Sequence, residues 1–256
     1  MKQSNEMINM LFRRKSEIRV DSDEHIRLMR YHSLLKSQAL KLEKKFIWLD
    51  NLISSQYQLQ ESSCDKINQC HQPVKDILKE ASLFRKGSLA SIEKQIQYSF
   101  KEWRILFPFF IRKDLKQLFT DISNIGILSA EQKLDFDEIM EWFNQQRDVL
   151  AMIGDGAIDM ALYHNVLLKN PTKSIDVALL NGVRERKSSN RALSLIFDIW
   201  EMNDLWFPSI PYMDSFFVNS EKQKGTVIEG LFGIIYLEND FDTFINITIN
   251  SLTIKE

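Results

Sequence analysis

Three aspartates lie on one side of the helix predicted for RDVLAMIGDGAIDMAL, residues 147–162. Asp148, Asp155 and Asp159 are seven and four positions apart, and these intervals return side chains to the same helical face. Carboxylates on one stripe repel each other unless water or a cation screens them. The pattern therefore predicts either a cation site or the solvated acidic edge of an amphipathic helix.

A further carboxylate, Glu229, stands just before an apolar run, Leu231–Leu237. Such a run is typical of a buried helix or strand. A glutamate that enters an apolar segment is costly to desolvate unless a cation or a hydrogen-bond donor meets it. One hypothesis is that Glu229 meets Asp155 across a helix–helix contact and that both carboxylates bind a divalent metal. The alternative is a glutamate at a helix end that faces water.

Glycines accompany both acidic segments, at Gly154, Gly156, Gly225, Gly230 and Gly233. A glycine in a helix interior costs roughly 1 kcal/mol relative to alanine. The usual compensation is the close approach of another backbone. The glycines therefore predict that two helices pack tightly beside the acidic residues.

The elements that position these residues are expected to be helices. The 256 residues include 8 Gly and 5 Pro, too few for the many turns of an all-β sandwich or barrel. Apolar spacings of three and four residues predict helices over 24–58 and 66–86, and a third from Ser88 or Ser91 to Phe107. These helices would form a hairpin or small bundle. The helical pattern resumes after the candidate cap Ser129 and ends at Pro171.

Charge divides the chain into two parts. Residues 1–120 hold 22 Lys and Arg against 14 Asp and Glu, a net of +8, and residues 121–256 hold 11 against 21, a net of −10. We predict a basic helical region over 1–110 of unassigned role and a second domain over 111–256. A basic region favours a polyanion partner, although two domains can also differ in charge without one. Candidate phosphate contacts there are Lys41, Lys44, Lys45, Arg85 and Lys86.

Composition excludes several classes of protein. Apolar residues are 44% and charged residues 27% of the chain, which argues against disorder as the main state. Cys64 and Cys70 are too few for a disulfide scaffold, and with His71 they lack the spacing of a zinc knuckle. No apolar run is long enough to span a membrane, and the first 20 residues lack the apolar part of a secretory signal. We therefore expect a cytoplasmic protein without membrane association.

Three motifs together resemble the endonuclease domain of the ribonuclease III family. LAMIGDGAIDMAL at 150–162 is similar to the signature helix, and TVIEGLFGIIYLEND at 226–240 to the second acidic motif. Between them, SIDVALLNGVRERKSSNRALSLIFDIW at 174–200 is similar to the family's helix, basic turn and helix. The resemblance covers about residues 125–250, with the motifs in the family's order and spacing. It implies an all-α, ribonuclease III-like domain preceded by the helical hairpin or bundle.

The sequence departs from the family's pattern at three acidic positions. Asp148 and Ala151 stand where the signature helix usually has two glutamates, and Thr226 replaces an aspartate three residues before Glu229. The compact Mini-III branch resembles this pattern, with Leu-Ala before the Gly-Asp pair and a threonine in the second motif, and that branch is active. Asp155 and Glu229 are the metal-binding acids that this chain retains.

The resemblance implies a Mg²⁺-dependent endoribonuclease that cleaves double-stranded or structured RNA, with Mn²⁺ as a possible substitute and ribosomal RNA maturation as the suggested setting. Asp155 and Glu229 would bind the metal, and Mg²⁺ needs only one or two carboxylates besides water. Asp148 is a third candidate catalytic acid. Asp159 would orient metal-bound water, and Thr226 would hydrogen-bond water or a phosphate.

The resemblance also implies a homodimer in which Met152 is an apolar contact between signature helices. RNA in A-form is recognised mainly through phosphates and 2′-hydroxyls. The candidate RNA-binding residues are Arg184, Arg186, Lys187, Arg191, Lys222 and Lys224. One alternative is a non-catalytic ribonuclease III-like protein that binds RNA or assembles a ribonucleoprotein, which Ala151 and Thr226 favour. Another is a helical scaffold unrelated to RNA.

Overall fold

The protein is all-α throughout the part of the chain that the structure describes. In that part, the computed structural model contains α-helices, one 3₁₀ turn and no strand, as the low glycine and proline content predicts. None of the helices there has an apolar stretch of the length that a bilayer requires. The described residues are 23–59, 64–83, 89–106, 116–170, 175–202 and 220–252.

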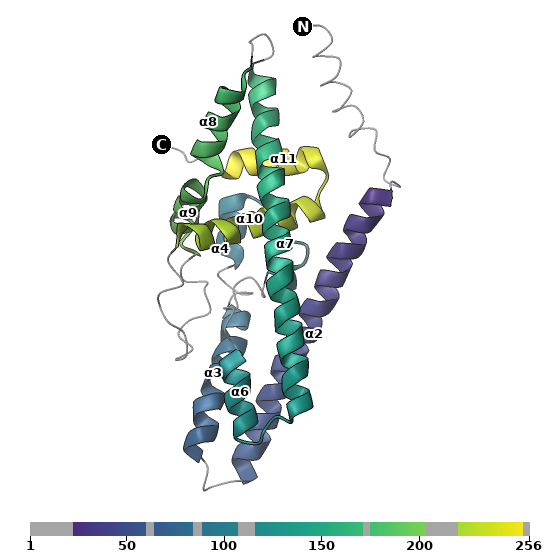
Figure 1. Ribbon diagram of the computed structural model, residues 1–256, viewed down its shortest axis with the longest axis vertical. Coiled ribbons are helices and arrows are strands. Elements are labelled where there is room, and N and C mark those ends of the chain that lie inside the picture. The colour runs from purple at the N-terminus through teal and green to yellow at the C-terminus, as the bar shows by residue number, and fades with distance from the viewer. Residues whose placement is uncertain are drawn as a thin grey trace.

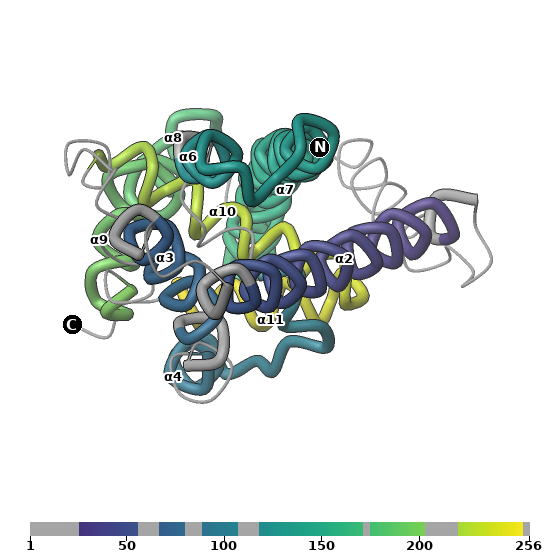
Figure 2. Tube along the Cα trace, turned by 90° about the horizontal axis from the view of Figure 1, so that it is seen from below, coloured from purple at the N-terminus to yellow at the C-terminus, as the bar shows by residue number. Residues whose placement is uncertain are grey.

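The first two helices form an antiparallel hairpin, α2 (Asp23–Leu59) and α3 (Cys64–Leu83), as the apolar spacing predicts (Figure 1). Seen along the long axis, α2 extends away from the other helices toward its N-terminal end (Figure 2). The buried stripe of α2 repeats at three- and four-residue intervals. It consists of Leu35, Ala39, Leu42, Phe46, Leu49 and Ile53.

The third predicted helix is much shorter than expected. Helix α4 covers Leu89–Ile96, and the prediction that it reaches Phe107 was wrong. Gln97 has a φ of 56°, a left-handed conformation that ends a helix. The carboxylate of Glu93 then accepts a hydrogen bond from the backbone N–H of Phe100 at 2.7 Å, which holds the chain in its new direction. A 3₁₀ turn, η3 (Trp103–Ile105), follows.

Helix α7 (Ala130–Lys169) is the longest element that the structure describes, and its 40 residues extend about 60 Å. Ser129 and Gln132 form a capping box at its start, which confirms the predicted cap. The short helix α6 (Lys116–Asn124) lies before it. Phe119 of α6 packs against Phe136 of α7 with ring centres 4.7 Å apart, and Phe46 of α2 lies 6.1 Å from Phe136. This aromatic cluster joins the N-terminal hairpin to α7.

Three shorter helices, α8 (Val177–Lys187), α10 (Glu221–Glu238) and α11 (Phe241–Ser251), pack against α7, and a fourth, α9 (Asn190–Ile199), packs against α10. The predicted helix, basic turn and helix are α8 and α9. Helices α10 and α11 lie across α7 at a steep angle (Figure 1). The most extensive helix–helix contact in the described structure is between α7 and α10. The apolar run after Glu229 is therefore part of a buried helix and not a strand.

Glu238, near the end of α10, connects the two halves of the chain. Its side chain is fully buried and accepts hydrogen bonds from the Tyr98 hydroxyl at 2.5 Å and the backbone N–H of Lys101 at 3.0 Å. His32 of α2 lies 3.1 Å from the same carboxylate. Burial raises the pKa of Glu238, but the hydrogen bonds from His32, Tyr98 and Lys101 outweigh it, so the pKa is lower than usual. This ionised carboxylate holds α2 and the segment after α4 against α10.

Candidate functional site

The backbones of α7 and α10 touch at two glycines. A Cβ atom at Gly154 would lie 1.8 Å from the carbonyl oxygen of Glu229, and one at Gly233 would lie 2.2 Å from that of Leu150. Only glycine fits at either position, as the sequence predicts for Gly154 and Gly233. The same prediction was wrong for Gly156, where a Cβ would meet nothing within 4 Å because this position faces outward.

This helix crossing brings together the acidic cluster, which consists of Asp155, Asp159 and Glu229. Burial, and then the charges of Asp155 and Asp159, raise the pKa of Glu229 to about 7. Burial and the charge of Asp159 likewise raise the pKa of Asp155, and the charge of Arg184 partly opposes them. The cluster therefore concentrates negative charge at a partly desolvated place, which disfavours ionisation of its carboxyl groups.

Arg184 of α8 forms ion pairs with two members of the acidic cluster. Its Nε lies 2.7 Å from Oδ2 of Asp159, and its Nη2 lies 3.8 Å from Oδ2 of Asp155. The hydroxyl of Ser188 donates a 2.6 Å hydrogen bond to the other oxygen of Asp159. Asp159 is thus held on both oxygens, whereas Asp155 has only the longer contact among the residues that the structure describes. The sequence predicted Arg184 as an RNA-binding residue and gave no role to Ser188. Apolar spacing and capping residues do not indicate that the basic turn packs against α7.

Two other predicted site residues, Asp148 and Thr226, are not part of this acidic cluster. Asp148 is exposed two turns before Asp155, about 10 Å along α7, and its charge is not a cause of the shifted pKa of Asp155 or Glu229. Thr226 donates its hydroxyl hydrogen to the backbone oxygen of Lys222 at 2.9 Å, one turn earlier in α10. Ala151 is buried and has no group that binds metal.

The predicted RNA-binding residues lie near the turn between α8 and α9 or at the start of α10. Arg186, Lys187 and Arg191 line a groove of about 210 Å³ beside this turn. Lys187 also donates to the backbone oxygen of Leu252 at 3.2 Å. Lys224 forms a 2.6 Å ion pair with Asp198, and Lys222 is exposed. The side chains of Arg186 and Arg191 are exposed to solvent.

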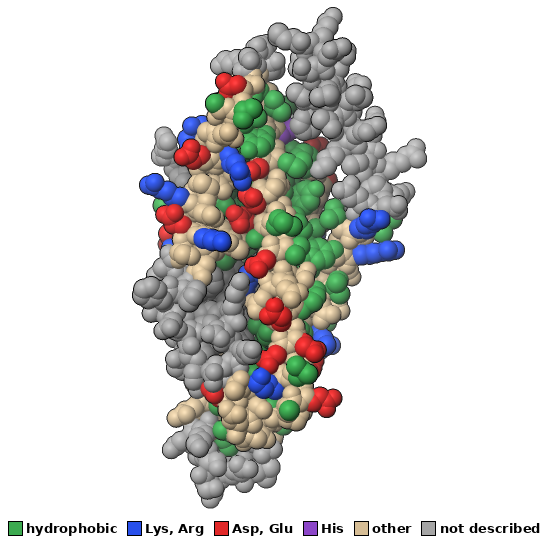
Figure 3. Space-filling model, in the orientation of Figure 1, with side chains coloured by type: hydrophobic (Ala, Val, Ile, Leu, Met, Phe, Trp, Pro, Cys, Tyr) green, Lys and Arg blue, Asp and Glu red, His purple; other side chains and the backbone are tan. Residues whose placement is uncertain are grey.

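An apolar stripe lies on α7 next to the acidic cluster. Met152, the predicted dimer contact, is 71% exposed, and Val149 and Met160 on the same stripe are 37% and 41% exposed. Figure 3 shows apolar side chains gathered along α7 beside a face where acidic and basic side chains alternate. An exposed apolar strip of this kind is typical of a surface that another molecule covers.

The described residues contain no group of three or more His, Cys, Asp or Glu side chains arranged to hold one metal ion. The three carboxylates of the acidic cluster influence each other electrostatically without forming such a group. Mg²⁺ needs only one or two carboxylates besides water and phosphate oxygens, so the absence of a three-residue group from the described ranges does not exclude a site held by two. His71 of α3 is instead buried, with its Nε2 3.0 Å from Asp50 and 3.2 Å from Ser54 of α2.

No match was found. Comparisons of the chain with protein-family models, with curated proteins and with solved structures each returned nothing. What this site does is therefore inferred from its residues and their geometry.

Proposed function

We propose that this protein is a Mg²⁺-dependent endoribonuclease that cleaves double-stranded or structured RNA. The observation that carries this proposal is the acidic cluster at the glycine crossing, where Asp155 of α7 and Glu229 of α10 share one electrostatic environment. The two acids are 74 positions apart in the chain, and both belong to motifs that resemble ribonuclease III. One or two carboxylates are enough to hold the Mg²⁺ ion that metal-assisted hydrolysis of a phosphodiester uses.

The electrostatics of the pair fit a divalent cation. Glu229, with a pKa of about 7, is only partly ionised at neutral pH because burial, and then the charges of Asp155 and Asp159, disfavour its ionised form. When bound by Asp155 and Glu229, Mg²⁺ supplies an acidified water molecule and neutralises phosphate oxygens. Asp159 is oriented by Arg184 and Ser188 and can accept a hydrogen bond from water beside the pair.

The surroundings of the cluster fit an RNA backbone. Arg184 lies against the acids and is half exposed, so its guanidinium can turn toward a phosphate that approaches the site. Arg186 and Arg191 extend the positive surface along the neighbouring groove. Contacts of this kind bind A-form RNA through its phosphates, without reading its sequence.

We also propose that two copies associate through the apolar stripe of Met152, Val149 and Met160. The stripe adjoins the acidic cluster, so a second copy there would place two sites in one assembly. Analytical ultracentrifugation tests this: Met152→Asp is expected to convert a dimer to a monomer. A wild-type chain that sediments as a monomer at micromolar concentration would overturn the dimer proposal.

A second candidate function is RNA binding without cleavage. Arg184 already neutralises part of the acidic charge, and the described residues hold no three-ligand metal group. These observations favour a ribonuclease III-like protein that has kept its fold and its basic surface for binding RNA or for assembly of a ribonucleoprotein.

Cleavage of labelled double-stranded RNA separates these candidates. We expect cleavage in Mg²⁺, none in EDTA, and losses of at least about 100-fold for Asp155→Asn and for Glu229→Gln. Glu141→Gln is the matched control, since Glu141 is exposed on the same helix far from the cluster. Binding without cleavage in either Mg²⁺ or Mn²⁺ would refute the nuclease and favour the second candidate.

A further inference from the structure

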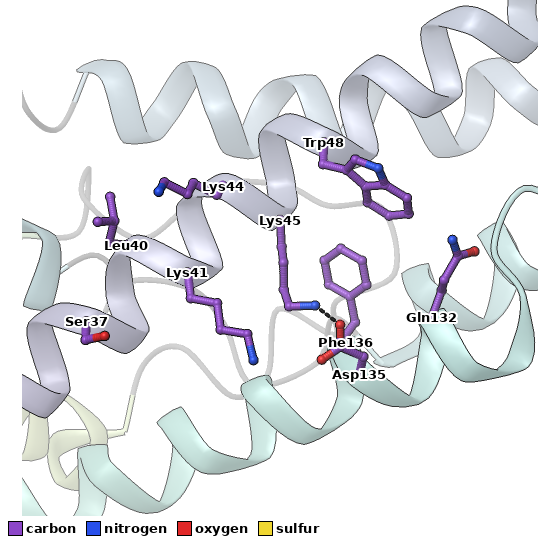
Figure 4. A pocket seen from close by; sticks show the side chains of 9 residues that line it. All are labelled: Ser37, Leu40, Lys41, Lys44, Lys45, Trp48, Gln132, Asp135 and Phe136. Atoms are coloured by element: carbon purple, nitrogen blue, oxygen red, sulfur yellow. Dashed lines mark hydrogen bonds and ion pairs between the residues drawn. The ribbon is translucent and has the colours of Figure 1, made fainter.

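A groove of about 550 Å³ lies between α2 and the N-terminal part of α7, away from the acidic cluster (Figure 4). We call it the lysine–tryptophan groove. Lys41, Lys44, Lys45 and Trp48 line it from α2 at intervals of three and four residues, so they share one face of that helix. Asp135 and Phe136 line it from α7.

The groove has more positive than negative charge. Lys45 forms an ion pair with Asp135, and its ammonium also lies 5.1 Å from the centre of the Phe136 ring. Burial and then the charge of Lys41 lower the pKa of Lys45, so the positive charges of these two lysines repel each other. In the described part of the chain, Lys41 and Lys44 have no carboxylate within ion-pair distance. The lining residues thus leave two lysine charges unbalanced.

An aromatic surface is open to solvent beside these charges. Trp48 is 40% exposed, although tryptophans are highly buried on average. Its ring stacks on Phe136 with centres 6.4 Å apart and planes at 28°. Phe136 is in turn fixed among the buried rings of Phe46 and Phe119. Trp48 is therefore a supported platform with an uncovered part of its surface.

We propose that the lysine–tryptophan groove binds a segment of single-stranded nucleic acid. Lys41 and Lys44 contact its phosphates, and one base stacks on Trp48. Proteins that bind single strands combine a positive groove with aromatic platforms in this way. Because Asp135 and Asp155 are 20 residues apart on α7, the groove lies about 30 Å along the helix from the acidic cluster. Its occupation does not depend on whether that cluster cleaves RNA.

The pairing of charge with an exposed ring favours nucleic acid over an acidic peptide. Carboxylates of a peptide would match Lys41 and Lys44 but would not need the Trp48 platform. A nucleotide carries a flat base a short distance from its phosphate. It can therefore stack on Trp48 while its phosphate contacts Lys41 or Lys44 on the same face of α2. Every base has a face that stacks, and the groove therefore has no need to read sequence.

The test uses the full chain in EDTA, so that cleavage plays no part. The probe is a labelled oligoadenylate of about 12 nucleotides, within the usual site size for single-strand binding. We expect fluorescence anisotropy to show binding that weakens with salt. Lys41→Gln/Lys44→Gln should lower the slope of log affinity against log salt by about 1.4. The matched control is Lys75→Gln/Lys79→Gln, which removes equal charge from exposed positions on α3 and should leave binding unchanged.

The stacking component has its own variants. Trp48→Ala should weaken binding by about tenfold or more, and Trp48→Phe should restore most of it. The proposal is overturned if the control lysine pair matters as much as Lys41 and Lys44. It is also overturned if an abasic oligomer of equal length binds as well as oligoadenylate, or if oligoglutamate competes equally at the same charge concentration. Those outcomes would mean a general anion surface or a peptide site.

Discussion

Replacement of Gly154 by alanine tests the helix crossing on which the acidic cluster depends. The added methyl group would lie 1.8 Å from the carbonyl oxygen of Glu229 and 2.8 Å from the backbone nitrogen of Gly233. Both atoms belong to the backbone, so no rotamer change can relieve the overlap. Helix α10 would have to move by about 1.6 Å before the closest contact reached 3.4 Å, where ordinary van der Waals contact begins.

The expected loss of stability is large for a single methyl group. Overpacking typically costs about 1–3 kcal/mol, and more where the backbone must move. Alanine recovers about 1 kcal/mol through its better helix propensity. We expect a net loss of about 3 kcal/mol, which corresponds to a fall in Tm of roughly 6–12 °C for a domain of this size.

Gly156→Ala is the matched control, two residues along the same helix. A Cβ there meets nothing within 4 Å, so only the propensity gain of about 1 kcal/mol applies and Tm should rise by roughly 2–4 °C. Thermal unfolding followed by circular dichroism measures both changes in the Met152→Asp background, because the exposed Gly156 lies between Met152 and Met160 on the proposed dimer stripe. Equal stability of the two variants would refute the crossing, and with it the electrostatic coupling of Asp155 and Glu229.

Three further predictions concern charged groups. The pKa of Glu229 is about 7 in the folded chain, above its ordinary value, so the unfolded chain loses this proton at a lower pH than the folded chain does. The free energy of unfolding therefore falls as pH rises toward 7. Glu229→Gln should therefore be more stable than wild type by about 1–2 kcal/mol near pH 8, after allowance for solvent screening, with no gain near pH 4 in the same melts. Arg184→Gln should raise the pKa of Asp155 further and tighten Mn²⁺ binding several-fold in calorimetric titrations; unchanged affinity would contradict the ion pair. Glu238→Gln should cost about 1–3 kcal/mol at neutral pH in urea unfolding. Because its pKa is lowered, that cost should shrink as pH falls, and a constant cost would show that Glu238 is not ionised.

Sequence patterns predicted the elements well where local rules set them. The cap at Ser129, the two hairpin helices and the helices on both sides of the basic turn follow from apolar spacing and capping residues. The end of α4 was missed because Gln97 adopts a left-handed conformation without the glycine that usually signals it. The stabilising hydrogen bond, from the backbone N–H of Phe100 to the carboxylate of Glu93, is one that periodicity does not reveal.

The candidate site was predictable to a lesser extent. The glycine signal correctly placed a tight crossing at Gly154, but it could not distinguish Gly156, because two positions along a helix point in different directions. The pairing of Arg184 with Asp155 and Asp159 depends on how α8 folds back on α7, and no local pattern records that. The lysine–tryptophan groove likewise requires knowing that α2 lies beside α7.

Calorimetric titration of Mn²⁺ into the protein tests the central claim most directly, namely that Asp155 and Glu229 bind one divalent cation together. We predict one site per chain, lost in Asp155→Asn and in Glu229→Gln alike, with the double variant no worse than either single variant because both act on one ion. Affinity should rise as pH increases through 7, as Glu229 ionises. Wild-type affinity in either single variant, or the absence of any site in the wild-type chain at millimolar Mn²⁺, would contradict the claim.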